Sequence, residues 1–184
     1  DVDHNDSTLL IYVQDADDSF ASRAKSGLAG QLLRSAYFSS LRTEQQLGYV
    51  VSAGSRRLLK RSGMLFLVQS PVAGVTDLEQ ATSNFLQTYL AAWPELSETE
   101  FTQQKAGLIN RLMEKDKNLG ERSQRYWADL TDENYQFDSR AQIAAEVDQL
   151  SKQDMAEFFK SLQERISKQR LLIYSEGKFG QTPT

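Results

Sequence analysis

The chain has 184 residues, of which 40% are hydrophobic and 25% are charged, and its formal net charge is −4. This composition is typical of a globular protein that is long enough to bury a substantial core, and not of a disordered chain. The acidic balance argues against a general nucleic-acid surface, and no apolar run approaches the roughly 20 residues that cross a bilayer.

The chain opens with an acidic, polar segment, residues 1–6, which we expect to be a frayed arm. This arm carries the only histidine, His4, and the chain has no cysteine. Zinc sites draw mostly on several Cys and His ligands, and the inverted motif H-x-x-E-H needs two histidines. We therefore expect no zinc site in this chain. Because Asp1 is not an initiator methionine, we also expect the chain to be a piece of a longer polypeptide.

A strand and a long helix are predicted next. Residues 8–13 are an apolar run rich in strand formers, which predicts a well-buried strand. Residues 15–19 form an acidic turn that can cap a helix starting near Phe20. Small residues, among them Gly27 and Gly30, would let this helix lie close to a sheet. The core-facing stripe of the helix has helical spacing and consists of Ala24, Leu28, Ala29, Leu32, Leu33, Ala36 and Tyr37.

Residues 41–51, with the sequence LRTEQQLGYVV, join this helical pattern to a strand pattern. We expect Gly48 to end the helix in the left-handed C′ conformation. Arg42 would then lie near the helix C-terminus, where its charge suits the helix dipole, and Tyr49 would open the next strand beside it. On these residues alone, a structural role for both is favoured over a functional one.

Two strands are predicted at residues 49–54 and 64–70, joined by a loop rich in positive charge. The favoured interpretation of this loop is a solvated hairpin tip. The alternative is a cationic patch that attracts acidic or C-terminal parts of a peptide. The cations are Arg56, Arg57, Lys60 and Arg61.

The chain after Pro71 is predicted to be mainly helical. Capping boxes are expected at residues 76–79 and 97–100, with a weaker cap at Ser151, and Pro94 should separate the first two helices. Residues 114–125 are highly charged and should be largely exposed. Their expected contacts with the body of the protein are Leu119, Tyr126, Trp127 and Leu130. Further helices at 140–150 and 151–165 and a last strand at 171–174 complete the chain.

This order of elements is β-α-β-β, several helices and then β. It predicts an α+β fold in which helices pack on one face of an antiparallel or mixed sheet, as one domain covering residues 1–184. No glycine-rich phosphate loop is present. The acidic clusters are interpreted as caps or solvated faces, so no self-contained catalytic set is identified. These clusters are Asp15, Asp17 and Asp18, and Asp132 with Glu133.

Three stretches match motifs in order and spacing. Residues 41–51 fit L-R-T-x-E/Q-Q-L-G-Y-x-V, and residues 126–127 with 135–138 fit Y-W…Y-x-F-D. Residues 115–119 correspond to a third motif, E-K-P-K-x-L, but Asp116 replaces its proline. Without that proline, the sequence does not specify that a helix ends at this point. From about Ser7 to Ser175 the chain thus resembles the last of four related domains in the insulysin/pitrilysin family of zinc peptidases.

The resemblance implies a C-terminal part of a zinc metalloendopeptidase that degrades peptides and small proteins. This part closes the substrate chamber, while the N-terminal half of the same polypeptide holds the zinc. By the match, Arg42 and Tyr49 reach the zinc site from this half. Tyr49, whose ordinary pKa is about 10, would donate to the oxyanion formed at the scissile carbonyl, and Arg42 would hold a substrate carbonyl. The resemblance also implies a periplasmic location, with the cytoplasm as the alternative. The acidic charge and the lack of a long apolar run predict no nucleic-acid or membrane partner.

Two other functions stay open. A non-catalytic relative would use this domain only for assembly or peptide binding. Finding H-x-x-E-H upstream in the parent gene would distinguish a peptidase from such a relative. A helical interaction module would instead predict a large exposed apolar helix face.

Overall fold

The computed structural model describes residues 5–179 and contains one antiparallel sheet with the strand order β2-β3-β1-β4. β1 is central because it pairs on both sides: Leu10 lies opposite Leu67 of β3 and Ile173 of β4. The strands are β1 (Ser7–Gln14), β2 (Val50–Ser55), β3 (Gly63–Ser70) and β4 (Leu171–Ser175).

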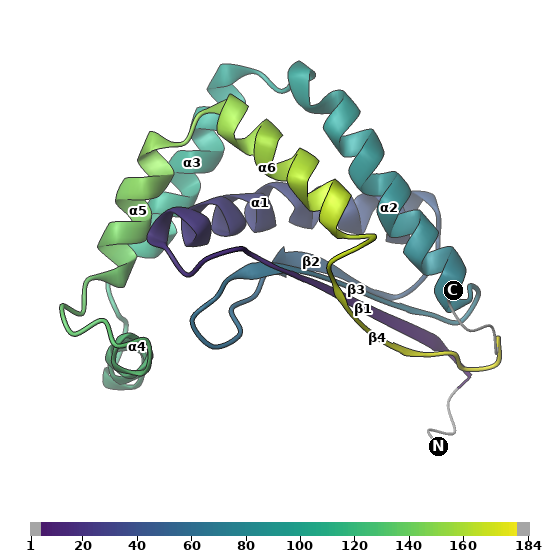
Figure 1. Cartoon of the computed structure of the whole chain (residues 1–184), viewed down its shortest axis with the longest axis horizontal. Helices are drawn as coiled ribbons and strands as arrows, with labels where there is room; N and C mark the ends of the chain where they lie inside the picture. The colour runs from purple at the N-terminus through teal and green to yellow at the C-terminus, as the bar shows by residue number, and fades with distance from the viewer. Residues whose placement is uncertain (1–4, 180–184) are drawn as a thin grey trace.

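Five helices cover one face of this sheet, and a sixth lies apart at one end (Figure 1). The covering helices are α1 (Phe20–Phe38), α2 (Val75–Ala92), α3 (Glu98–Met113), α5 (Ser139–Gln149) and α6 (Lys152–Arg165); the one apart is α4 (Leu119–Thr131). A 3₁₀ turn at Trp93–Glu95, which contains Pro94, separates α2 from α3 as predicted. The predicted α+β class is confirmed. None of the helices within residues 5–179 is long and apolar enough to cross a bilayer.

The core lies between the sheet and the covering helices. Alternate residues of β1, Leu9, Ile11 and Val13, are buried against them. The predicted stripe of α1 is largely confirmed, since its Ala24, Leu28, Ala29, Leu33 and Tyr37 are fully buried. A Cβ at Gly30 would lie 2.5 Å from the backbone nitrogen of Ser55, so this glycine lets α1 approach β2 closely.

The predicted helix starts are confirmed in α1, α3 and α6 but not in α2. Ser19 caps α1, and Ser97 and Ser151 form capping boxes. The box expected to start at Thr76 is wrong, because α2 begins one residue earlier, at the buried Val75. Burial of Val75 fixes this start, and Gly74 serves as a cap without a side-chain hydrogen bond.

The acidic cluster at residues 15–18 is mainly structural. Asp17 accepts hydrogen bonds from Ser19 and Ser22 at the start of α1, and these bonds lower the pKa of Asp17 to about 2. Asp15 is buried and accepts a bond from the Ser26 hydroxyl, and burial raises its pKa above the ordinary value.

The orientation of α4 differs from the prediction. Leu119 is 82% exposed and Trp127 is 67% exposed, and Tyr126 and Leu130 also face solvent. The expected apolar contacts with the body are therefore wrong. The buried residue of α4 is instead Asp129, which accepts a hydrogen bond from the Ser139 hydroxyl. A polar edge of the helix thus faces the protein, and its apolar edge faces outward.

The loop between β2 and β3 contacts the end of α4, so it is not simply the solvated tip that was predicted. Arg57 forms an ion pair with Asp132, whose side chain is only 3% exposed, and Lys60 forms one with Glu133. Arg23 of α1 binds the same Asp132 oxygen at 3.1 Å. Asp132, the C-cap residue of α4, is therefore an anchoring point, whereas Glu133 stays at the surface as predicted.

Candidate functional site

The candidate site begins where α1 widens into a π-helical turn, Ser39–Glu44, before the chain enters β2. Leu41 is fully buried and fixes this turn to the core. The left-handed residue is Gln46, at φ 54°, and not Gly48 as predicted. A π-helical turn contains one more residue than an α-helical turn. The helix therefore ends before Gly48, and Gln46 takes the left-handed conformation. Gly48 is needed for close approach instead, because a Cβ there would lie 2.0 Å from the Gln69 carbonyl oxygen.

Arg42 lies in this turn, with its guanidinium held between two groups. Its Nη1 donates to the backbone carbonyl of Tyr49 at 2.9 Å. Its Cζ lies 5.0 Å from the centre of the Phe38 ring, within the range of a cation–π contact. The structure therefore brings Arg42 and Tyr49 together, through the Tyr49 main chain.

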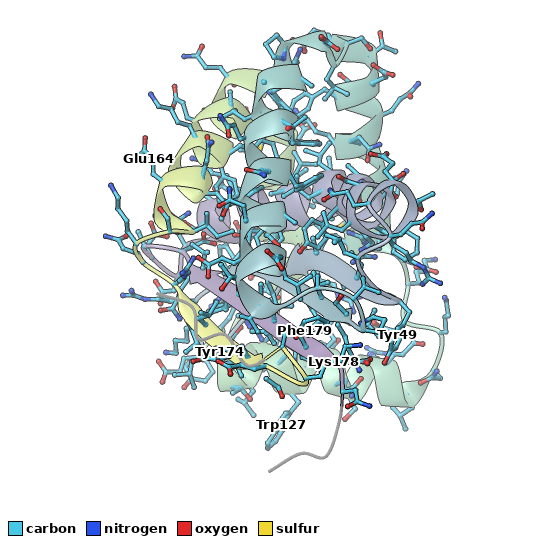
Figure 2. The ribbon with its side chains drawn as sticks, turned by 90° about the vertical axis from the view of Figure 1, so that its right-hand side faces the viewer. Tyr49, Trp127, Glu164, Tyr174, Lys178 and Phe179 are labelled. Carbon is cyan, nitrogen blue, oxygen red and sulfur yellow. The ribbon has the colours of Figure 1, made fainter. Side chains whose placement is uncertain are left out.

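The Tyr49 side chain lies just before β2, at the end of the sheet where β1 starts, and is 49% exposed (Figure 2). Its hydroxyl donates to Asp6 Oδ2 at 2.6 Å and accepts from Gln69 Nε2 at 2.7 Å. The same Gln69 nitrogen lies 3.2 Å from Asp6 Oδ2. Asp6, Tyr49 and Gln69 thus form a closed polar triangle.

The electrostatics of this triangle keep Tyr49 protonated. The hydrogen bond to Asp6 raises the pKa of Tyr49, with smaller contributions in the same direction from desolvation and from the Asp6 charge. The phenol is therefore a hydrogen-bond donor throughout the neutral range. An exposed phenol donor and an exposed guanidinium on one rigid junction can together bind a peptide carbonyl or stabilise a developing oxyanion.

Sequence reasoning did not identify Asp6 or Gln69. Asp6 fell within the expected frayed arm, and Gln69 is one polar residue near the end of an apolar strand. The polar side chain of Gln69 within a mainly apolar strand was the one signal available in the sequence. The contact with Tyr49 depends on strand register, which the sequence pattern does not specify.

The described residues contain no group of metal-ligand side chains. Within residues 5–179, no three His, Cys, Asp or Glu side chains are grouped closely enough to bind a metal ion. His4 lies outside the described residues. That this chain binds no zinc stays a prediction, tested below.

The exposed side of α4 forms a second surface, which we call the α4 face. It contains a shallow groove of about 560 Å³, and Trp127 points away from the body of the protein (Figure 2). The groove is lined by Ser123, Tyr126, Trp127, Leu130 and Phe137. Three of these, Tyr126, Trp127 and Phe137, belong to the Y-W…Y-x-F-D run.

Comparisons with known proteins agree with this architecture. The family described as "PQQ synthase PqqF-like, C-terminal lobe domain 4" matches residues 28–127, which include Arg42, Tyr49 and Gln69. "Protease 3" from an Escherichia coli O6:H1 strain is 34% identical over 155 residues, which are 84% of this chain but 16% of that protein. The chain therefore spans a minor part of this relative.

Two solved structures share the fold. The crystal structure of pitrilysin superposes with a TM-score of 0.82 and 30% identity, over 97% of this chain and 19% of that chain. The inactive peptidase domain of a putative zinc protease from Bordetella parapertussis has a TM-score of 0.75 and 10% identity, over 94% of this chain and 93% of that chain. The second similarity shows the fold alone.

Proposed function

Because the chain belongs to the PqqF-like C-terminal lobe family, and is thus a C-terminal domain of the M16 (insulysin/pitrilysin) peptidases, we propose that it completes the active site of a zinc metalloendopeptidase. The substrates would be peptides and small proteins. Residues 1–184 would make one domain that closes the substrate chamber, and the N-terminal half of the same polypeptide would bind the zinc. The observation that carries this proposal is the pairing of Arg42 with Tyr49 on one exposed junction.

Each of the two residues has a distinct role in the proposal. Zinc bound by the other half would polarise the scissile carbonyl and activate water; the described residues lack a group of ligands for it, so no such step is assigned to them. Tyr49 would donate its O–H to the oxyanion that develops on the carbonyl. A guanidinium has five N–H donors, so Arg42 can bind the Tyr49 carbonyl and a substrate carbonyl together.

We further propose that the N-terminal half of the polypeptide covers the α4 face. Large apolar patches on soluble proteins usually mark interaction sites, and polar bonds of Asp129 and Asp132 already fix the opposite edge of the helix. The periplasm stays the proposed compartment, with the cytoplasm as the alternative.

The isolated chain should self-associate as its concentration rises, because the α4 face is uncovered. Trp127→Ser should shift sedimentation-velocity profiles toward monomer by removing a large, exposed apolar side chain of that face. Val72→Ser, at an exposed apolar residue in the turn before α2, is the matched control and should leave the profiles unchanged. A chain that stays monomeric at every concentration would argue against a covered face.

The metal content of the isolated chain tests the division of labour between the two halves. After dialysis, the purified chain should hold well under one zinc per molecule and should not hydrolyse peptides. The full-length polypeptide should bind zinc and hydrolyse peptides. Metal analysis and a chelator-sensitive peptidase assay on the two preparations measure this. Near-stoichiometric zinc with chelator-sensitive hydrolysis in the isolated chain would contradict the proposal.

The alternative is a non-catalytic domain used for assembly or peptide binding. It is favoured by one observation, that the same fold occurs in a protein described as an inactive peptidase domain. A full-length polypeptide without H-x-x-E-H, or one with no peptidase activity, would support this alternative.

A further inference from the structure

We propose that Gln69 is a positioning residue for Tyr49. The side-chain amide of Gln69 donates to the phenol oxygen of Tyr49 and leaves the phenol proton for the substrate. The amide nitrogen of Gln69 lies 2.7 Å from the Tyr49 hydroxyl oxygen. The inference rests on the proposed function, because it assigns Gln69 a role in the reaction through Tyr49.

The position of Gln69 is fixed by the sheet. It lies near the end of β3, opposite Thr8 of β1 and Val50 of β2, so strands hold its backbone on both sides. Tyr49 precedes Val50 directly, and Gly48 passes against the Gln69 carbonyl. Two backbone contacts therefore hold the Gln69 and Tyr49 backbones close together.

The chemistry of an amide suits this position. A phenol has one proton to donate, and an amide N–H group can only donate. Gln69 Nε2 thus donates a hydrogen bond to the phenol oxygen of Tyr49 and cannot accept the phenol proton. Because hydrogen bonds in a chain polarise one another, donation to the oxygen also makes the phenol O–H a stronger donor.

When no substrate is bound, the Tyr49 hydroxyl donates its hydrogen bond to Asp6. The Asp6 carboxylate oxygen lies 2.6 Å from the Tyr49 hydroxyl oxygen and 3.2 Å from Gln69 Nε2. Asp6 precedes β1, whereas Gln69 lies inside a paired strand. An oxyanion that competes for the hydrogen bond would replace Asp6 as the acceptor, while Gln69, which donates to the phenol oxygen, keeps the phenol in place.

A double-mutant cycle in the full-length enzyme, with a peptide substrate, tests the inference. Gln69→Met keeps the length of the side chain without the donor, and should lower kcat by about three- to tenfold, the usual range for one neutral hydrogen bond, with KM unchanged. In a Tyr49→Phe background, Gln69→Met should not lower kcat further, because the hydroxyl that Gln69 positions is absent.

Further variants keep the test independent of folding. Gln69→Glu keeps the size but offers the phenol an acceptor, so it should lower kcat more than Gln69→Met does. Thr8→Val, at the same sheet row across β1, is the matched control and should leave kcat unchanged. Losses that multiply in the double mutant, or a change in KM alone, would overturn the role of Gln69. A wild-type kcat in Tyr49→Phe would instead overturn the proposed function.

Discussion

Tyr49→Phe in the full-length enzyme should lower kcat by about 10²–10³-fold, the usual cost of removing one oxyanion donor. The variant lacks one hydroxyl and keeps the ring. That hydroxyl makes its bonds to Asp6 and Gln69 at a half-exposed site, so its loss should change the melting temperature little. Steady-state kinetics and thermal unfolding of the same preparation measure both quantities.

Arg42→Ala provides the contrast for this variant. It should raise KM as well as lower kcat, because it removes a group that holds the substrate and also the bond to the Tyr49 carbonyl. A purely structural role for the junction predicts the reverse pattern, with a lower melting temperature and near-normal kinetics. A Tyr49→Phe enzyme with wild-type kcat would remove Tyr49 from the mechanism.

Asp132→Ala should lower the free energy of unfolding by about 3–5 kcal/mol, as expected when one member of a buried ion pair is removed. Arg23 is buried and binds Asp132, and its Nε has no hydrogen-bond partner among the described residues. Without the carboxylate, the Arg23 charge stays buried and uncompensated. Urea unfolding, monitored by tryptophan fluorescence, measures the change.

Glu133→Ala is the matched control because it removes the neighbouring carboxylate. The Glu133 side chain is 63% exposed and pairs with Lys60 at the surface. Such pairs contribute about 0.2–1 kcal/mol, so this variant should unfold close to wild type. Equal losses in the two variants would show that burial of Asp132 does not decide its contribution.

The regular elements could be predicted because each carries its own period. The apolar run of β1 and the stripe of α1 specify burial locally, and the order of elements then restricts the topology to few choices. The Arg42–Tyr49 junction could be found because a motif of eleven residues marks it. Its roles in catalysis stay predictions.

The orientation of α4 could not be predicted from its pattern. An amphipathic helix indicates that its apolar side is covered, but not by what. Here Asp132, just after the helix, is held by Arg23, 109 residues away in the sequence, and the apolar edge faces outward. The contact between Tyr49 and Gln69 was missed for a related reason, since it follows from a pairing register between separate strands.

The π-helical turn makes the length of the junction as important as its composition. Deleting one residue within Ser39–Glu44 would let the turn close as an ordinary α-helix, and each residue of an α-helix turns the chain by about 100°. Arg42 would then leave the side on which it meets Tyr49, with every side chain of the junction still present. In an alignment of such domains, residues 43–46 should therefore tolerate substitutions far better than they tolerate gaps.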